Sequence, residues 1–305
     1  MFSSLDNVND TVNYARGVIK QIDHINGMDD SLSDIKTLMF AAMLDFYGMK
    51  HVDEIYLAFL RTDFILCDDL CDTLSEKYGL SYDYVLKLIE HCPGTFYAVD
   101  AVKDLKTNKY KFKRSIYISD KIGTNTLIRS LTHQVNHVIN SFNRPVLKKN
   151  GDYVSRMGIS VEHFGSRRTE VLGLEEAIND FQTEDILKCI KRFSDDEITD
   201  LGVKRLLDSF TFDGLLQNDK NTLFSEIVEP LYTEKLFNES LIKGRFSGDL
   251  ASIRNCFDAV VGNGSFGCLL AFCDKLEKLD NSSSQLEYEE EKAKCLVKRY
   301  VDNCK

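Results

Sequence analysis

Apolar residues recur at intervals of three and four along most of this chain, and that spacing predicts a protein built mainly from helices. The pattern covers residues 4–93, 124–143, 170–189, 195–277 and 286–303. Only 3 of the 305 residues are proline, which interrupts helices, so few positions force a break. With 43% hydrophobic residues, a chain of this length can bury a large core.

Three stretches near the middle have strand character instead. Residues 95–102 and 109–118 are rich in β-branched and aromatic side chains, and Asp104–Asn108 between them supplies turn-forming residues. They predict an antiparallel hairpin just ahead of the helix over 124–143. Alternating apolar residues over 146–161 predict a second, short hairpin. The expected fold class is therefore α+β, mostly helical, with a small antiparallel sheet beside the 124–143 helix.

Charge and cysteine content limit the partners and the compartment. The net charge is −10 and the sequence pI is about 5.2, so we expect neither nucleic acid nor an anionic membrane as a partner. Nine cysteines without a CxxC pair suit a reducing compartment. Residues 1–7 lack the features of a signal peptide, and no apolar run reaches transmembrane length. These observations predict a cytoplasmic protein.

The segment His133-Gln134-Val135-Asn136-His137 carries the clearest chemical signal. Two histidines four positions apart lie on the same face of a helix, because one turn takes 3.6 residues. Two imidazoles on one face can bind one Zn²⁺ ion, which prefers nitrogen and sulfur ligands in tetrahedral geometry. A chance pair on a helix surface is the alternative interpretation. The surrounding pattern favours a metal site.

A second helix supplies candidate acidic ligands. It contains Glu175 and Glu176, with Asp180 one turn after Glu176. Glu176 could bind the metal through oxygen, and Asp180 could accept the far ring N–H of a ligand histidine and so fix its tautomer. Glu175 is a rival ligand, but the residue one turn after it is Asn179, so Glu176 is preferred.

A strand, a helix with His-x-x-x-His and a further helix with Glu-x-x-x-Asp together resemble the gluzincin clan of zinc metallopeptidases. The resemblance implies that His133, His137 and Glu176 bind Zn²⁺. It also implies that the Asp180 carboxylate accepts a hydrogen bond from a ligand histidine. It also implies that an edge strand around Tyr110–Ile118 lines the cleft and pairs with an extended peptide or protein substrate.

The resemblance covers about residues 95–190 and divides the chain into three expected regions. These are a helical N-terminal region (1–93), a zincin-like metal-binding core (94–190) and a helical C-terminal region (191–305). Neither terminal region carries a signature of its own.

Gln134 departs from the gluzincin pattern, which has glutamate after the first histidine as the general base. A neutral amide cannot take a proton from the attacking water, and loss of a general base lowers the rate about 10²–10⁴-fold. Two explanations stay open. Either the parent protein carries glutamate here and is active, or the chain is a natural pseudo-enzyme that keeps its cleft for binding.

A metallopeptidase also needs a group that stabilises the oxyanion formed at the substrate carbonyl. Tyr153, Arg156 and His163 lie between the two helices and are candidates, although each also fits an ordinary role in a hairpin. Three hypotheses follow: a zinc metallopeptidase that Gln134 leaves inactive or nearly so, a non-catalytic zincin-like protein that binds a peptide or protein, and a helical interaction protein without metal.

Overall fold

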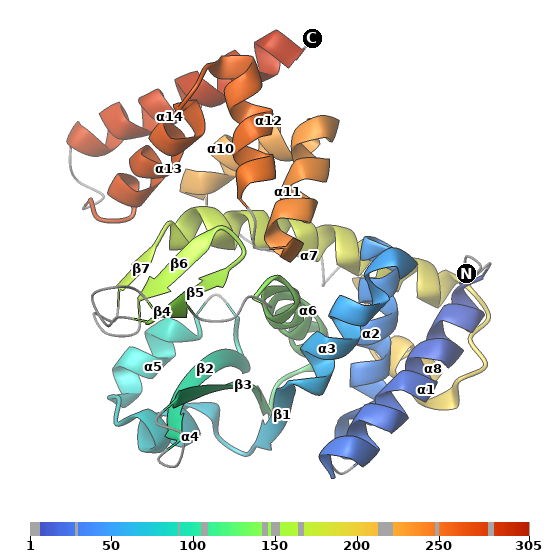
Figure 1. Ribbon diagram of the computed structural model, residues 1–305. Coiled ribbons are helices and arrows are strands. Elements are labelled where there is room, and N and C mark those ends of the chain that lie inside the picture. Colours follow the sequence, from blue (N-terminus) through green and yellow to red (C-terminus); the bar gives the residue numbers. More distant parts are fainter. Residues whose placement is uncertain are drawn as a thin grey trace. The chain divides into compact units, whose positions relative to one another are not determined.

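The computed structural model describes residues 7–27, 30–90, 92–104, 109–141, 146–147, 153–163, 168–212, 222–247, 250–279 and 284–304. By packing, the chain forms two compact units (Figure 1). Unit 1 comprises Met1–Ile139 and Thr183–Asn218, and unit 2 comprises Asn140–Gln182 and Asp219–Lys305. The predicted division into three regions along the sequence stays a prediction.

Unit 1 is built largely from helices around one largely buried helix. That helix is α2 (Ser33–Tyr47), in which the side chains from Leu38 to Met43 have no exposed surface. It packs against α1 (Val8–Asn26) and α3 (Val52–Leu60). The remaining short elements are η1 (Asp30–Leu32), η2 (Met49–His51), α4 (Leu70–Tyr78), α5 (Tyr82–Leu88) and α8 (Leu201–Leu207).

Local sequence explains where α1 begins and ends. The Asn7 side chain accepts a hydrogen bond from the Asp10 N–H at 2.8 Å, which caps the first turn. Gly27 ends the helix at φ 62°, a left-handed conformation that glycine adopts without a steric penalty. Inside unit 1, Lys36 of α2 forms an ion pair with Asp23 of α1, and both side chains are only 3% exposed.

A mixed sheet of three strands completes unit 1. The predicted hairpin is confirmed: β2 (Thr95–Asp104) runs antiparallel to β3 (Lys109–Ser119), with Thr95 opposite Ile118. The expected all-helical character of residues 4–93 is wrong at β1 (Thr62–Cys67), which pairs in parallel with β3. The sheet is therefore mixed rather than antiparallel.

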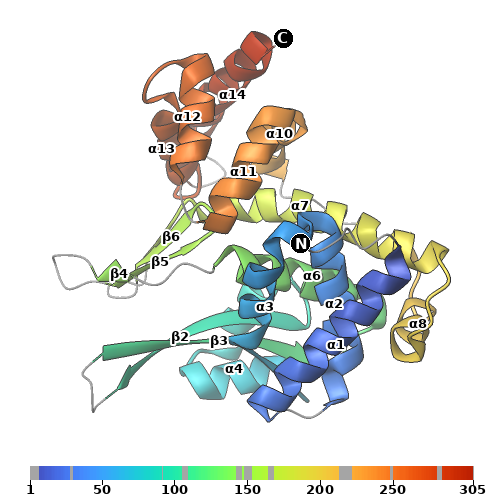
Figure 2. The same cartoon turned by 45° about the vertical axis from the view of Figure 1, so that its right-hand side comes forward.

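The strand order β1-β3-β2 corrects a second expectation. The strand around Tyr110–Ile118 was expected at the edge of the sheet, but β3 is the central strand, because β1 pairs with its Arg114–Ser119 portion. In the described pairing, Lys109–Lys113 of β3 pairs with β2 alone, so the expectation is wrong from Arg114 onward. Helix α6 (Thr124–Asn140), which carries the histidine pair, lies beside this sheet in both views (Figures 1 and 2).

Unit 2 contains the second predicted hairpin within a larger antiparallel sheet. The strand order is β4-β5-β6-β7, formed by β4 (Val146–Leu147), β5 (Tyr153–Met157), β6 (Ser160–His163) and β7 (Arg168–Glu170). Gly158, at φ 57°, lies in the turn between β5 and β6. Helix α7 (Leu172–Asp195) follows β7 directly.

The helices of unit 2 surround an aromatic core. Phe257 stacks on Tyr300 with ring centroids 4.9 Å apart, and Phe237 meets Tyr300 edge to face at 5.6 Å. These rings come from α11 (Lys235–Ser247), α12 (Ala251–Val261) and α14 (Ser284–Cys304), and α10 (Thr222–Thr233) and α13 (Ser265–Leu276) complete the set.

The chain is thus α+β and mostly helical, as predicted. Among the described residues, no single helix has both the length and the apolar character needed to cross a membrane. Within the same described residues, one pair, α12 and α13, bent by 107°, meets that criterion jointly, by length and composition alone.

Candidate metal centre

Both histidines lie on helix α6, and both side chains are buried. His133 and His137 are 5% and 3% exposed, and the apolar side chains of Ile128, Leu131 and Val135 on the same helix are almost completely buried. A helix that is buried around most of its circumference shields its polar groups from solvent. The histidines therefore lie in a dry environment.

Neutral hydrogen bonds fix α6 inside unit 1. The Tyr47 hydroxyl of α2 donates to the Asn136 side chain, which has no exposed surface and lies between the two histidines in sequence. The Thr132 hydroxyl lies 2.7 Å from the Ile128 carbonyl, which accepts its hydrogen bond, and 3.4 Å from the Met39 sulfur. The contacts of α2 residues Tyr47 and Met39 set the rotation of α6 about its own axis.

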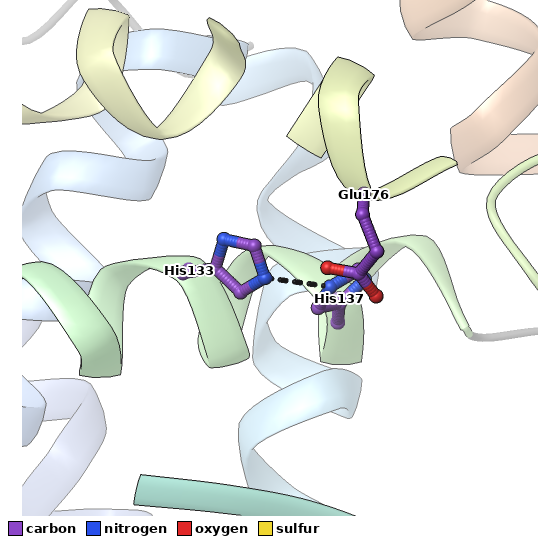
Figure 3. Close-up of side chains that lie close together, drawn as sticks. All are labelled: His133, His137 and Glu176. Carbon is purple, nitrogen blue, oxygen red and sulfur yellow. Dashed lines mark hydrogen bonds between the residues drawn. The ribbon is translucent and has the colours of Figure 1, made fainter. Parts of the chain in front are cut away.

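The two imidazoles face each other as the helical spacing predicts. Their Nε2 atoms are 2.9 Å apart and share a hydrogen bond, and the ring planes are inclined by 76° (Figure 3). Two nitrogen ligands of one tetrahedral Zn²⁺ at 2.0–2.1 Å would lie about 3.3 Å apart. A small outward movement of the rings is enough to admit an ion.

Glu176 of α7 completes a group of three. One ligand atom from each of His133, His137 and Glu176 lies within 4.8 Å of the others, and the glutamate is half-buried. Figure 3 shows the carboxylate directed toward the imidazole pair. The group could hold a metal ion through two nitrogens and one carboxylate oxygen. Among the described residues, this is the one group of three or more His, Cys, Asp or Glu side chains that could hold a metal ion.

Glu175, the rival ligand, has a different role in the structure. Its carboxylate has no exposed surface, forms an ion pair with Arg245 of α11 and accepts a hydrogen bond from the Ile159 N–H at 2.8 Å. Neighbouring residues on a helix project about 100° apart, so the two glutamates point in different directions. Glu176, not Glu175, belongs to the histidine group.

The remaining predicted site residues occupy defined backbone positions. Gln134 follows His133 on α6 and is 8% exposed, and Asp180 lies one turn after Glu176 on α7 and is half-buried. Tyr153 and Arg156 belong to β5, and His163 belongs to β6, but their side chains lie outside the described set. The roles of all five residues stay predictions.

Sequence reasoning missed two charged residues that hold the start of α7. Arg245 contacts Glu175 from 70 positions away. Glu277, which follows α13, accepts a hydrogen bond from the Gly173 N–H at 2.6 Å and so caps α7. Burial raises the pKa of Glu277, and the backbone N–H groups at this helix start oppose that rise. No local pattern connects either residue with α7.

The donor set fits several divalent metals. Two imidazole nitrogens and one carboxylate suit zinc, and the same combination is used for iron(II) in other proteins. Comparison with known proteins adds no further constraint, because no family model, no curated protein and no solved structure matches the chain.

Proposed function

We propose that the chain binds one zinc ion through His133, His137 and Glu176, in the manner of gluzincin metallopeptidases, and that Gln134 leaves it with little or no activity on peptide bonds. The observation that carries the proposal is the convergence of these three side chains from α6 and α7 within 4.8 Å. The order of the ligands along the chain and the half-buried Asp180 one turn beyond Glu176 agree with it.

Held by these three residues, zinc would polarise the carbonyl of a bound peptide and make water a stronger nucleophile. The chain's own residues must hold the ion, orient the substrate and accept a proton. Gln134 has nearly the shape of glutamate but no basic oxygen, so it can donate or accept a hydrogen bond but cannot take up the proton. The barrier rises by about 3–5 kcal/mol when a general base is lost.

Metal analysis of the purified protein tests the binding half of the proposal. We expect about one zinc ion per chain, and we expect His133→Ala and His137→Ala each to abolish stoichiometric binding. His24→Ala is the matched control, because His24 is exposed on α1 and lies outside the group. A chain without a bound ion after incubation with zinc would refute the site. Iron(II) in its place would refute the choice of metal.

Replacement of Gln134 by glutamate tests the catalytic half. With zinc bound, Gln134→Glu should raise the rate of cleavage of a mixed peptide library by at least about 100-fold over the unmodified chain. Gln134→Ala is the control, since it removes the amide without supplying a base.

A non-catalytic zincin-like binding protein is the second candidate, and Gln134 is the residue that favours it. This protein would recognise a peptide or protein partner without cutting it. If Gln134→Glu binds zinc fully and still cleaves none of the library, the peptidase proposal fails. The binding role then accounts for the site.

A further inference from the structure

Helix α7 starts from a strained backbone. Val171, immediately before its first residue, adopts φ 59° and is the one non-glycine residue with positive φ in the described part of the chain. A β-branched side chain is disfavoured in this conformation, so other contacts must hold it. The Glu277 carboxylate supplies one of them through the Gly173 N–H.

Arg245 forms charged contacts with the first turns of α7. Its guanidinium has no exposed surface and bonds to three side chains of α7, namely Glu175, Asn179 and Gln182. These acceptors are spaced at four and three residues, so they line one face of the helix. A planar fork of five N–H donors suits this row of oxygens, and lysine could not match it.

The turn between β5 and β6 joins the same cluster. The Ile159 N–H donates to Glu175, and the Gly158 N–H donates to the Asn140 carbonyl, the last residue of α6, at 3.1 Å. A Cβ atom at Gly158 would lie 2.1 Å from a Glu175 oxygen, so the turn approaches the carboxylate more closely than any larger residue permits. Two adjacent N–H groups thus bind the end of the histidine helix and the start of the glutamate helix.

We propose that Arg245 is a positioning residue for the metal site and that it acts through Glu175 and the Gly158–Ile159 turn. This inference rests on the proposed function. Fixing Glu175 also fixes Glu176, because the two project from consecutive positions of one rigid turn. The turn also fixes the end of α6, and His137 lies within one turn of Asn140. Pairing with Arg245 further prevents Glu175 from competing for the ion.

Zinc affinity, measured by competition with a chelator, distinguishes positioning from a purely structural role. We expect Arg245→Met to weaken zinc binding at least about 10-fold, as loss of a residue that orients metal ligands does elsewhere. The cobalt(II)-loaded variant should also show an altered visible absorption spectrum, since this spectrum reports the geometry of the ligands.

A double variant keeps the test valid if Arg245→Met folds poorly. Glu175→Met combined with Arg245→Met removes both charges and leaves neither buried alone, so the fold should survive. Because this variant also lacks the contacts of Arg245 with α7, its zinc affinity should still be lowered at least about 10-fold. Lys36→Met is the matched control, because Lys36 is also a buried cation paired with a buried carboxylate, but its partners Asp23 and Phe64 lie on α1 and β1.

The outcomes separate this inference from the proposed function. Weaker zinc binding in both Arg245 variants, with the affinity of Lys36→Met unchanged, supports the positioning role. Unchanged affinity and an unchanged cobalt spectrum in the double variant overturn it and leave the zinc site intact. Failure of the unmodified chain to bind zinc refutes the proposed function itself, and the positioning role with it.

Discussion

Around the histidines, the described contacts of α6 with α2 join neutral groups: the Tyr47 hydroxyl donates to Asn136, and the Thr132 hydroxyl lies 3.4 Å from the Met39 sulfur. At the start of α7, by contrast, charged groups take part: Arg245 pairs with Glu175 in the interior, and the half-buried Glu277 carboxylate accepts a hydrogen bond from the Gly173 N–H. The candidate ligands of α6 are thus positioned by neutral contacts, and the candidate ligand of α7 is positioned by charged ones. Loss of a charge should therefore destabilise the start of α7 more than loss of a neutral hydrogen bond destabilises α6.

Loss of Arg245 should produce the largest difference between the two helices. Arg245→Met leaves the Glu175 carboxylate buried without its cation, and breaking such a pair destabilises proteins by about 3–5 kcal/mol. We expect this decrease in the free energy of unfolding, measured by urea denaturation. Hydrogen exchange should locate the increased opening in α7 rather than in α6.

Two variants sharpen that result. Arg254→Met changes the same residue type at an exposed position of α12 and should alter stability by less than about 0.5 kcal/mol. Glu175→Met with Arg245→Met should recover most of the lost stability. A double variant as unstable as the single one would show that the contacts of Arg245 with Asn179 and Gln182, not its charge pair, hold α7.

Removal of the Tyr47 hydroxyl should have a moderate effect. Tyr47→Phe deletes one neutral hydrogen bond to a fully buried side chain, and we expect a loss of about 1–2 kcal/mol in thermal or urea unfolding. Tyr84→Phe, on a ring that is 52% exposed, is the control and should be neutral. If Tyr47→Phe destabilises the chain as much as Arg245→Met, the contrast between the helices is lost.

Substitution of Glu277 should have the smallest effect on the free energy of unfolding. The effect should appear in the pH dependence of that free energy. Because its pKa is raised above the ordinary 4.5, the folded chain binds this proton more tightly than the unfolded chain does. The stability that Glu277 contributes therefore falls as pH rises above 4.5 and levels off above the folded-state pKa. Glu277→Gln keeps an acceptor for Gly173 and should remove this part of the pH profile.

The control for that profile is Glu287→Gln, an exposed glutamate in the first turn of α14, which should leave the pH dependence unchanged. A profile for Glu277→Gln that coincides with that of the unmodified chain would show that the α7 cap does not titrate in the range that unfolding measurements reach.

What the sequence revealed about the site follows from local periodicity. The i, i+4 spacing of His133 and His137 is enough to place two imidazoles on one face of a helix, and the choice of Glu176 over Glu175 followed from the residue one turn later. Both inferences concern residues within a single helix. Helical order over so short a distance depends little on the rest of the molecule.

Features set by distant parts of the chain could not be foreseen in this way. Strand β1 pairs in parallel with β3, about fifty residues further on, and parallel partners leave no turn between them to signal the pairing. The contact between Arg245 and Glu175 spans 70 positions. A charged residue in an amphipathic helix looks like a surface residue until tertiary structure buries it against its partner.

The close approach of Gly158 to Glu175 offers a means of recognising distant relatives of this chain. A side chain of any size at position 158 would displace a charged group on another element, so the glycine can change only if the acid changes as well. A chain that keeps the paired histidines, the paired acids and a glycine in the preceding hairpin turn is expected to keep this arrangement even where little other identity survives.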